Sequence, residues 1–378
     1  MCGCCASGWH APAEGPGQGT GQGTAQESTD LPSFGWDEAA DQLVRTGRSW
    51  APSSSSQADA GQGPGVRVTY GFLAEDDVSS DGGRAYRAFD DAEMAMVEYA
   101  MQLISEVAGI EFVRVTGADG TFLDRPADAQ IDLDAMADTN AGIARTTWSG
   151  NLYRGATVSI GERGLEEVGS YAFRTALHEI MHAVGVSHPG DYDGRASYGA
   201  DAEYAEDSGQ YTVMSYFDET VTGADYGRAY STNLMLHDIA ALQAIYGANE
   251  GTRTGDDVYG FGSTTNDAGW SLEGPDDTLI AAIWDAGGRD LLDLSGYAAD
   301  QRIDLRAEAF SDVGGLTGNL SIARGVVIED AAGGAGDDAL TGNAAANTLV
   351  GGIGADLLVG GPGDDVLYGD AGPADWSV

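Results

Sequence analysis

Residues 178–188 read HEIMHAVGVSH, and they contain three of the five histidines in this chain of 378 residues. His178 and His182 are four residues apart, so in a helix their side chains lie on one face, close enough to bind the same ion. The helix is expected to end at Gly185, where a left-handed turn brings His188 towards the other two. Three imidazoles with an open fourth position are typical of a catalytic zinc ion. The stretch therefore predicts that His178, His182 and His188 bind zinc.

The helix that carries this motif is predicted over residues 170–185, with Ser170 as its N-cap. Glu179 directly follows the first histidine and is turned about 100° away from it around the helix axis. It can therefore reach a zinc-bound water without binding the metal, as a general base must. The ion lowers the pKa of the water and polarises a scissile carbonyl, while Glu179 takes the proton and passes it to the leaving amine. Ordinary helix histidines are the alternative, but five such positions rarely coincide by chance.

The composition of the chain is strongly acidic. It has 60 Asp and Glu against 18 Lys and Arg, which gives a formal net charge of −42. Such a charge repels phosphate backbones and anionic membranes, which argues against a nucleic-acid partner. No apolar run approaches the ~18 residues of a membrane span, so no membrane insertion is expected. A highly soluble or halophile-like surface and neutralisation by bound cations both remain open.

All three cysteines, Cys2, Cys4 and Cys5, lie in the first five residues. A fold held by disulfides is therefore excluded, and a structural metal must be bound by His, Asp, Glu or backbone oxygen. Residues 1–33 are rich in Gly, Gln, Thr and Ala and predict a disordered leader. A thiolate metal cluster and a lipidation site are the alternatives for its cysteines. The leader lacks a basic segment followed by an apolar one, so it does not resemble a standard secretory signal.

The segment after the leader, residues 34–249, predicts a mixed α/β domain. Residues 66–73 alternate like a strand, and residues 90–109 place apolar side chains on one face of a helix. Residues 129–137 and 156–161 read as further short strands. The order of strand, helix, strands and histidine helix indicates an α+β catalytic domain with a mixed sheet.

Residues 250–378 predict an all-β domain, and part of it consists of nine-residue repeats. From residue 333 onwards, successive units read GGAGDDALT, GNAAANTLV, GGIGADLLV and GGPGDDVLY, close to the template GGxGxDxUx. Each unit predicts a Gly-rich turn and a short strand whose apolar residue points into a parallel β-roll. A flexible linker is the alternative, but a linker does not maintain an apolar register through successive repeats.

The turns of these repeats are predicted to bind calcium, which prefers hard oxygen ligands. The carboxylates are Asp338, Asp356 and Asp365, with Asn347 as a neutral substitute. Alternate units should stack, so that Asp338 and Asp356 line one row of calcium sites, and Asn347 and Asp365 line a second row. The row with Asn347 should bind calcium less tightly. The roll should be loose without calcium and fold as the ion binds. The turn glycines of the predicted calcium sites are Gly334, Gly336, Gly351, Gly352, Gly354, Gly361 and Gly363.

Two motifs together resemble a known family. HExxHxxGxxH is the zinc signature of the metzincin metallopeptidases, which also carry a methionine turn, and YTVMSYF at 211–217 matches that turn. Within the metzincins the chain resembles the serralysins, from about residue 35 to about residue 370. The further segments that carry this resemblance are HPGDY (188–192), HDIAALQAIYGAN (237–249), RTGDDVYGF (253–261) and WDAGGRDLLDLSGY (284–297).

The resemblance implies further site residues. Met214 would lie beneath the zinc as an apolar floor, and Tyr216 would be an additional, switchable zinc ligand that stabilises the oxyanion. His237 departs from the pattern, because an acidic residue is expected there in relatives; it would be structural or would alter contacts near the site. Upstream of the repeats, where ordinary surface turns are the alternative, the resemblance implies calcium ligands from the Arg253 and Gly255 carbonyls, Asp257, Asp285, Gly287, Gly288, Asp290 and Glu329.

Taken together, these features predict a secreted zinc-dependent endopeptidase with a calcium-binding β-roll. It would act as a monomer on protein and peptide substrates, with a proteinaceous protease inhibitor as a further partner. The alternatives are a processing peptidase with a narrow target and a calcium-dependent extracellular binding or matrix module with a vestigial protease site. The intact Glu179 argues against the second alternative.

The resemblance also implies how the protein is exported and activated. Serralysins leave the cell through a C-terminal signal, but this sequence stops at Val378, soon after the repeats. A truncated version and another export route are therefore both open. The leader is expected to be a propeptide that delays activity, and one hypothesis is that a leader thiolate occupies the fourth zinc position until cleavage.

Overall fold

The computed structural model describes residues 31–51, 65–74, 78, 85–115, 129–161 and 163–370. Cys2, Cys4 and Cys5 lie outside these residues, so the expectations for the leader and its thiolates stay predictions. Within the described part, no helix combines the length and the apolar character that crossing a membrane requires.

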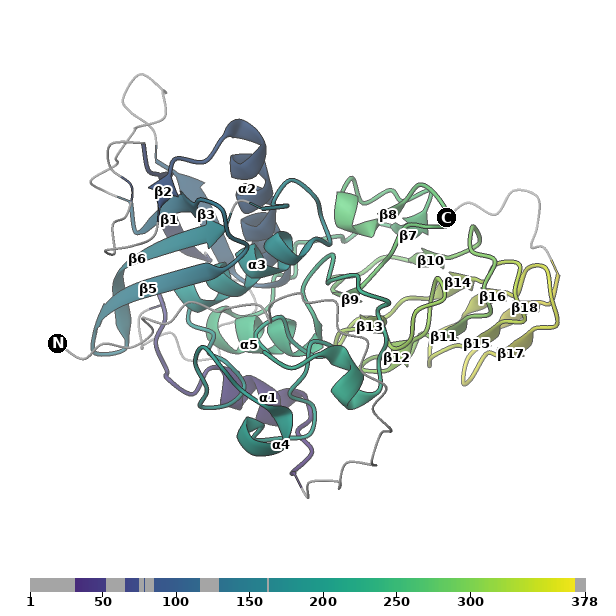
Figure 1. The fold of residues 1–378 in the computed structure, drawn as a ribbon. Coiled ribbons are helices and arrows are strands. Elements are labelled where there is room, and N and C mark those ends of the chain that lie inside the picture. Colours follow the sequence, from purple (N-terminus) through teal and green to yellow (C-terminus); the bar gives the residue numbers. More distant parts are fainter. Residues whose placement is uncertain are drawn as a thin grey trace, which may run out of the picture.

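The first part of the chain combines a mixed sheet with helices (Figure 1). Its elements are α1 (Trp36–Leu43), β1 (Val66–Phe72), β2 (Tyr86–Arg87), α2 (Asp91–Val107), β3 (Ile110–Arg114), β4 (Ile131–Met136), β5 (Gly142–Ser149), β6 (Leu152–Gly161), α3 (Tyr171–Ala183), α4 (Tyr198–Asp201), the 3₁₀ helix η2 (Glu219–Thr222) and α5 (Leu236–Tyr246). The strand order is β3-β1-β4-β6-β5, and β2 pairs with β4. Strands β1, β3, β4 and β6 run parallel, whereas β5 runs antiparallel to β6. The mixed sheet predicted from the sequence is therefore confirmed.

Helices cover this sheet and bring the histidine motif onto it. Helix α3 packs against β5 and β6, α2 packs against α3, and α1 packs against α5. Helix α2 begins at a capping box in which the Asp90 side chain accepts the Glu93 N–H and the Glu93 side chain accepts the Asp90 N–H. Its buried residues, which include Val97, Met101 and Ile104, follow the predicted apolar face.

The sequence patterns missed three strands of this sheet, β2, β3 and β5, and of these β5 lies next to the histidine helix α3. The first three residues of β5 are all buried, so it lacks the alternation by which a half-buried strand is recognised. After β5 the chain reverses at Gly150, which has a φ of 63°. Strand β6 follows and pairs with β5 in antiparallel orientation. Strand β6 accordingly begins at Leu152, ahead of the predicted range 156–161.

The second part of the chain is a roll of short strands (Figure 1). Its elements are β7 (Val258–Phe261), the 3₁₀ helix η3 (Ala268–Trp270), β8 (Ser271–Leu272), β9 (Ala281–Ile283), β10 (Leu291–Asp293), β11 (Arg302–Asp304), β12 (Phe310–Ser311), β13 (Leu320–Ile322), β14 (Asp330–Ala332), β15 (Ala339–Thr341), β16 (Thr348–Val350), β17 (Leu357–Val359) and β18 (Val366–Tyr368). One sheet has the order β18-β16-β14-β10-β7-β8, a second β11-β15-β17 and a third β12-β13-β9.

The stacking of alternate repeats is confirmed. Strand β15 pairs in parallel with β17, and β16 pairs in parallel with β18, so each unit lies beside the next but one. The inward register holds at Leu340 and Leu349, which are buried, but Leu367 in the last described unit is 45% exposed. The pairing of β12 with β13 is antiparallel, which departs from an entirely parallel roll.

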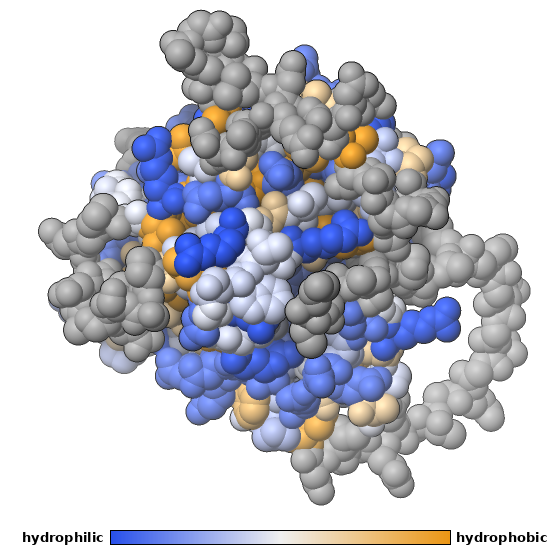
Figure 2. All heavy atoms as spheres, turned by 90° about the vertical axis from the view of Figure 1, so that its left-hand side faces the viewer, coloured by the Kyte–Doolittle hydropathy of each residue, from blue (hydrophilic) through white to orange (hydrophobic). Residues whose placement is uncertain are grey.

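The two parts share a continuous apolar core that includes residues of both. Polar contacts reinforce their junction: the Trp284 indole donates to the Asn249 carbonyl at 3.0 Å, and the Arg253 guanidinium donates to the Trp284 carbonyl at 2.9 Å. Arg253 also forms an ion pair with Glu106 of α2. On the face in Figure 2 the coloured residues are largely hydrophilic, in keeping with the acidic composition.

Candidate metal centre

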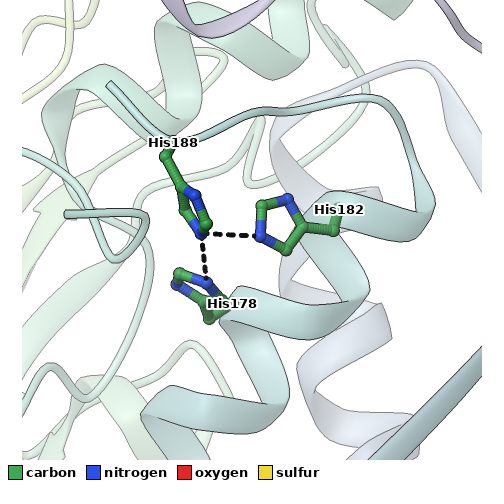
Figure 3. A group of neighbouring side chains, drawn as sticks. All are labelled: His178, His182 and His188. Carbon is green, nitrogen blue, oxygen red and sulfur yellow. Dashed lines mark hydrogen bonds between the residues drawn. The ribbon is translucent and has the colours of Figure 1, made fainter. Parts of the chain in front are cut away.

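The three histidines of the motif converge as the sequence predicts (Figure 3). Ser170 accepts the Phe173 N–H and starts helix α3, and Gly185 ends the helical segment with a φ of 111°. A side chain at Gly185 would place its Cβ 2.3 Å from the Arg48 carbonyl oxygen, so the turn requires glycine. The return of the chain places His188 opposite His178 and His182, which project from the helix.

The distances between the histidine nitrogens fit a zinc ion. The His188 Nε2 atom lies 3.2 Å from the His178 Nε2 and 3.0 Å from the His182 Nε2. Tetrahedral zinc with Zn–N bonds of about 2.0–2.1 Å implies nitrogen separations of about 3.3 Å. Small outward movements of the rings would therefore let all three histidines hold one ion.

The other nitrogen of each imidazole faces a backbone carbonyl, which fixes the ring. The Nδ1 atoms of His178, His182 and His188 lie 2.8–2.9 Å from the carbonyl oxygens of Val213, Val186 and Tyr192. A ring that donates through Nδ1 presents the Nε2 lone pair to a metal. Burial lowers the pKa of His182 to about 4 and also lowers those of His178 and His188. Neutral imidazoles are the form that metal binding needs.

Glu179 lies between the histidine helix and the edge of the sheet. Its side chain is buried, and a Cβ atom added to Gly142 of β5 would lie 2.6 Å from its Oε1. Burial raises the pKa of Glu179 to about 8 in the metal-free protein. A bound divalent cation would stabilise the charged carboxylate and would therefore lower the pKa of Glu179. A carboxyl group whose pKa lies near the ambient pH can exchange a proton readily.

The methionine turn lies beside the triad. Met214 is buried, and the preceding residue, Val213, provides the carbonyl that fixes His178. The Tyr216 ring is 4.5 Å from the His188 ring and 6.0 Å from the His178 ring, measured between centroids. The structure therefore places Tyr216 against the histidines and Met214 in the core, next to the residue that contacts His178.

Asp238, which the sequence patterns did not single out, anchors this turn from helix α5. Its carboxylate accepts the Thr212 hydroxyl at 2.6 Å and the Val213 N–H at 3.0 Å. The neighbouring His237 is buried against Tyr211, with ring centroids 4.9 Å apart, and burial lowers its pKa to about 3. His237 thus packs in the core behind the methionine turn, in line with a structural role.

A group of carboxylates lies at the start of the roll. Oxygen atoms of Asp257, Asp285 and Asp290 lie within 4.8 Å of one another. Burial, followed by the like charges of Asp285 and Glu329, raises the pKa of Asp290 to about 7. The Asp290 Oδ2 atom is buried and has no hydrogen-bond partner among the described residues. Such a group is suited to a divalent cation with oxygen ligands.

The other residues that the serralysin resemblance implies as calcium ligands upstream of the repeats lie around the same carboxylates. The Glu329 side chain accepts the Asp290 N–H at 2.9 Å, and Gly287 donates its N–H to Asp285 at 2.7 Å. A Cβ atom on Gly288 would lie 1.9 Å from the Gly255 carbonyl oxygen, so these two backbones are in close contact. The Arg253 carbonyl oxygen accepts the N–H of Ala286.

The repeat turns stack in the two predicted rows. Asp356 accepts the Asp338 N–H at 2.9 Å in one row, and Asp365 accepts the Asn347 N–H at 3.0 Å in the other. The Asn347 amide group donates to the Glu329 carbonyl at 2.8 Å. In the second row, the Glu329 carbonyl therefore accepts a hydrogen bond from the neutral Asn347 amide. This arrangement fits the expectation that the second row binds cations less tightly.

The glycines of the repeats allow these turns to approach closely. A Cβ atom on Gly352 would lie 2.1 Å from the Gly334 carbonyl oxygen, and one on Gly354 would lie 2.0 Å from that of Gly336. An added Cβ atom would also lie too close to side-chain or backbone atoms at the remaining turn glycines, Gly351, Gly361 and Gly363.

Comparison with known proteins gives consistent matches. Residues 248–372 match the family described as Peptidase M10 serralysin C terminal. Serralysin C of Dickeya chrysanthemi is 40% identical over 315 residues, which are 82% of this chain and 64% of that protein. Serralysin of Proteus mirabilis is 39% identical over 327 residues, and metallopeptidase AprA of Pseudomonas marginalis is 38% identical over 326 residues, each covering 82% of this chain and 65% of the relative. The chain thus spans somewhat less than two thirds of the length of these relatives. Over the part that it shares with them, the chain is similar to the serralysins.

Proposed function

We propose that the chain is a secreted zinc-dependent endopeptidase that is stabilised by calcium in its C-terminal roll. The observation that carries this proposal is the convergence of three neutral imidazoles beside the buried carboxylate of Glu179. The names of the relatives, which are serralysins and metallopeptidases, support the same chemistry.

Each residue of the site then has a defined task in peptide hydrolysis. His178, His182 and His188 would hold the zinc, which when bound supplies a Lewis acid for the scissile carbonyl and the attacking water. Glu179 takes a proton from the water and returns it to the leaving amine. Tyr216 donates a hydrogen bond to the developing oxyanion. Strand β5 lies at the edge of the sheet beside Glu179, where an extended peptide can pair with it.

The calcium part of the proposal assigns ions to the roll. Asp257, Asp285, Asp290 and Glu329, with carbonyls of Arg253, Gly255, Gly287 and Gly288, would hold one, and the repeat turns at Asp338, Asp356 and Asp365 would hold others. The ions would be structural, because the roll brings carboxylates together that repel one another without a cation.

The experiment that tests the activity is hydrolysis of an unfolded protein substrate by the purified full chain in calcium. We expect cleavage that is lost on treatment with a zinc chelator and restored by zinc up to one ion per chain. A protein that binds one zinc and still does not cleave, even after removal of residues 1–33, would contradict the proposal. That result would favour the alternative of a calcium-dependent extracellular binding module with a vestigial site.

Replacement of Gly142 by alanine tests the geometry around Glu179. The added Cβ would lie 2.3 Å from the Glu179 Cγ atom, so the carboxylate must move. We expect kcat to fall about 100-fold, since a displacement of about 1 Å at a catalytic group has this effect, while one zinc stays bound. Gly155→Ala on β6 is the matched control, because its Cβ would approach only the Thr147 hydroxyl, at 3.3 Å. Equal activity of the two variants would show that Glu179 does not need its present position.

A further inference from the structure

Asp207 is a buried carboxylate near the histidine triad that has no task in the proposed reaction. It lies between α4 and η2 and is completely inaccessible to solvent. Within the described ranges, no Lys, Arg or His side chain forms an ion pair with it. Burying a carboxylate without a cation costs free energy, so hydrogen bonds must offset that cost. Its partners therefore indicate what the carboxylate does.

Two hydroxyl groups from different segments donate to Asp207. The Ser215 hydroxyl lies 2.7 Å from Oδ1, and the Tyr192 hydroxyl lies 3.0 Å from Oδ1 and 3.2 Å from Oδ2. Ser215 belongs to the methionine turn, and Tyr192 follows the third histidine of the motif. A single carboxylate thus joins the two segments that border the triad on this side.

Tyr192 transmits this connection to His188. Its backbone carbonyl oxygen lies 2.9 Å from the His188 Nδ1, and its ring stacks on the His188 ring with centroids 5.4 Å apart and planes inclined by 15°. Both the carbonyl and the ring of Tyr192 therefore fix the direction in which His188 presents its Nε2. Such outer contacts orient metal ligands and are worth a substantial part of the metal affinity.

Ser215 transmits the connection to Tyr216, which follows it in the chain. The Ser215 hydroxyl oxygen accepts the Phe217 N–H at 3.0 Å, so the backbone on both sides of Tyr216 is tied to Asp207. The Tyr192 ring also packs on the Tyr216 ring, with centroids 5.0 Å apart. Tyr216 is thus held through its backbone and through its ring by the two partners of one carboxylate.

We propose that Asp207 is a positioning residue that fixes His188 and Tyr216 relative to each other. It acts through Tyr192 and Ser215, so that the third zinc-binding imidazole and the phenol that faces the oxyanion move as one unit. The inference rests on the proposed function, because it assigns a task towards the zinc and the substrate.

The test compares variants of the full chain at Asp207 and Tyr192. Asp207→Ala removes both hydrogen bonds, whereas Asp207→Asn keeps an oxygen that can accept both hydroxyls. We expect Asp207→Ala to weaken zinc binding about 10–100-fold and to lower kcat with little change in KM. It should also change the visible absorption of the cobalt-substituted protein, which reports the ligand geometry. Asp207→Asn should restore most of the zinc affinity and the wild-type spectrum, and Tyr192→Phe should cause a partial loss of the same kind.

Tyr70→Phe is the matched control for Tyr192→Phe. Both tyrosines are 7% exposed, and the Tyr70 hydroxyl donates to Glu98 at 2.8 Å, away from the triad. This variant should lower the melting temperature without changing zinc affinity or the cobalt spectrum.

Two results would overturn the inference while leaving the proposed function intact. The first is an Asp207→Ala protein that melts at a lower temperature but binds zinc and turns over substrate like wild type; Asp207 would then only stabilise the fold. The second result is a Tyr192→Phe protein whose zinc affinity and cobalt spectrum are the same as those of wild type. This variant provides the test if Asp207→Ala does not fold. A wild-type protein that binds no zinc would overturn the proposed function itself, and this inference with it.

Discussion

Glu179→Gln is expected to abolish most peptide hydrolysis while the protein keeps its zinc. Glutamine has nearly the same shape as glutamate and can occupy the space beside Gly142, but it cannot take a proton from water. General-base catalysis contributes roughly 10²–10⁴-fold to such reactions, so kcat should fall by about 10³-fold. The measurement is kcat on a peptide substrate, together with the zinc content of the same sample. Exposed Glu166 provides the control, since Glu166→Gln should leave both values unchanged.

Glu179→Gln should also change how the stability of the metal-free protein depends on pH. Burial raises the pKa of Glu179 from 4.5 to about 8, so the folded state binds this proton more tightly than the unfolded state. The resulting stability is present below the unfolded pKa and is lost as pH rises through about 8. Metal-free wild type should therefore lose more stability between pH 5 and pH 8 than metal-free Glu179→Gln. Identical pH dependence of the two melting temperatures would contradict the buried position of this carboxylate.

Removal of calcium is expected to loosen the roll and to lower the stability of the whole chain. The carboxylates of Asp257, Asp285 and Asp290 lie within 4.8 Å of one another and would repel without a cation. Calcium at about 1,000 times its dissociation constant would contribute about 4 kcal/mol to folding. Calorimetry and circular dichroism with calcium or a chelator measure the change. Magnesium at the same concentration should not replace calcium, because it demands a smaller octahedral site. An unchanged melting temperature in chelator would contradict the calcium assignment.

In the absence of calcium, the melting temperature should decrease as pH rises. Burial and neighbouring carboxylates raise the pKa of Asp290 to about 7, and burial raises that of Asp338. A raised carboxyl pKa gives stability that is lost as pH increases through the folded value. In chelator the melting temperature should therefore fall as pH rises from 4 to 7, whereas in saturating calcium it should rise because protons compete with the ion.

A matched pair of variants locates the calcium effect in the repeats. Asp338 is 1% exposed and lies in a repeat turn, whereas its neighbour Asp337 is exposed. Asp338→Asn should raise the calcium concentration needed for folding, and Asp337→Asn should have a much smaller effect. Equal shifts for both variants would show that general charge, and not a site in the turn, determines the response.

Local patterns were sufficient to predict the centre of the site and the repeat stacking. Two histidines four residues apart must share a helical face, and Gly185 permits the turn that returns His188. A nine-residue period with an apolar residue in each unit likewise requires that alternate units pair, as β15 with β17. Both inferences follow from the regular geometry of the backbone, so they need no knowledge of distant contacts.

The sequence by itself thus determined the group of three histidines, the carboxylate beside it, the order of an α+β part and a roll, and the two rows of turns. Only the tertiary structure decided that β5 borders Glu179, that Asp238 anchors the methionine turn and that Asp207 joins Tyr192 to Ser215. It also joined both parts through one core. These features depend on residues far apart in the chain, whose pairing is set by packing and by the need of buried polar groups for partners. No local period records such a pairing, and for this reason the sequence could not show it.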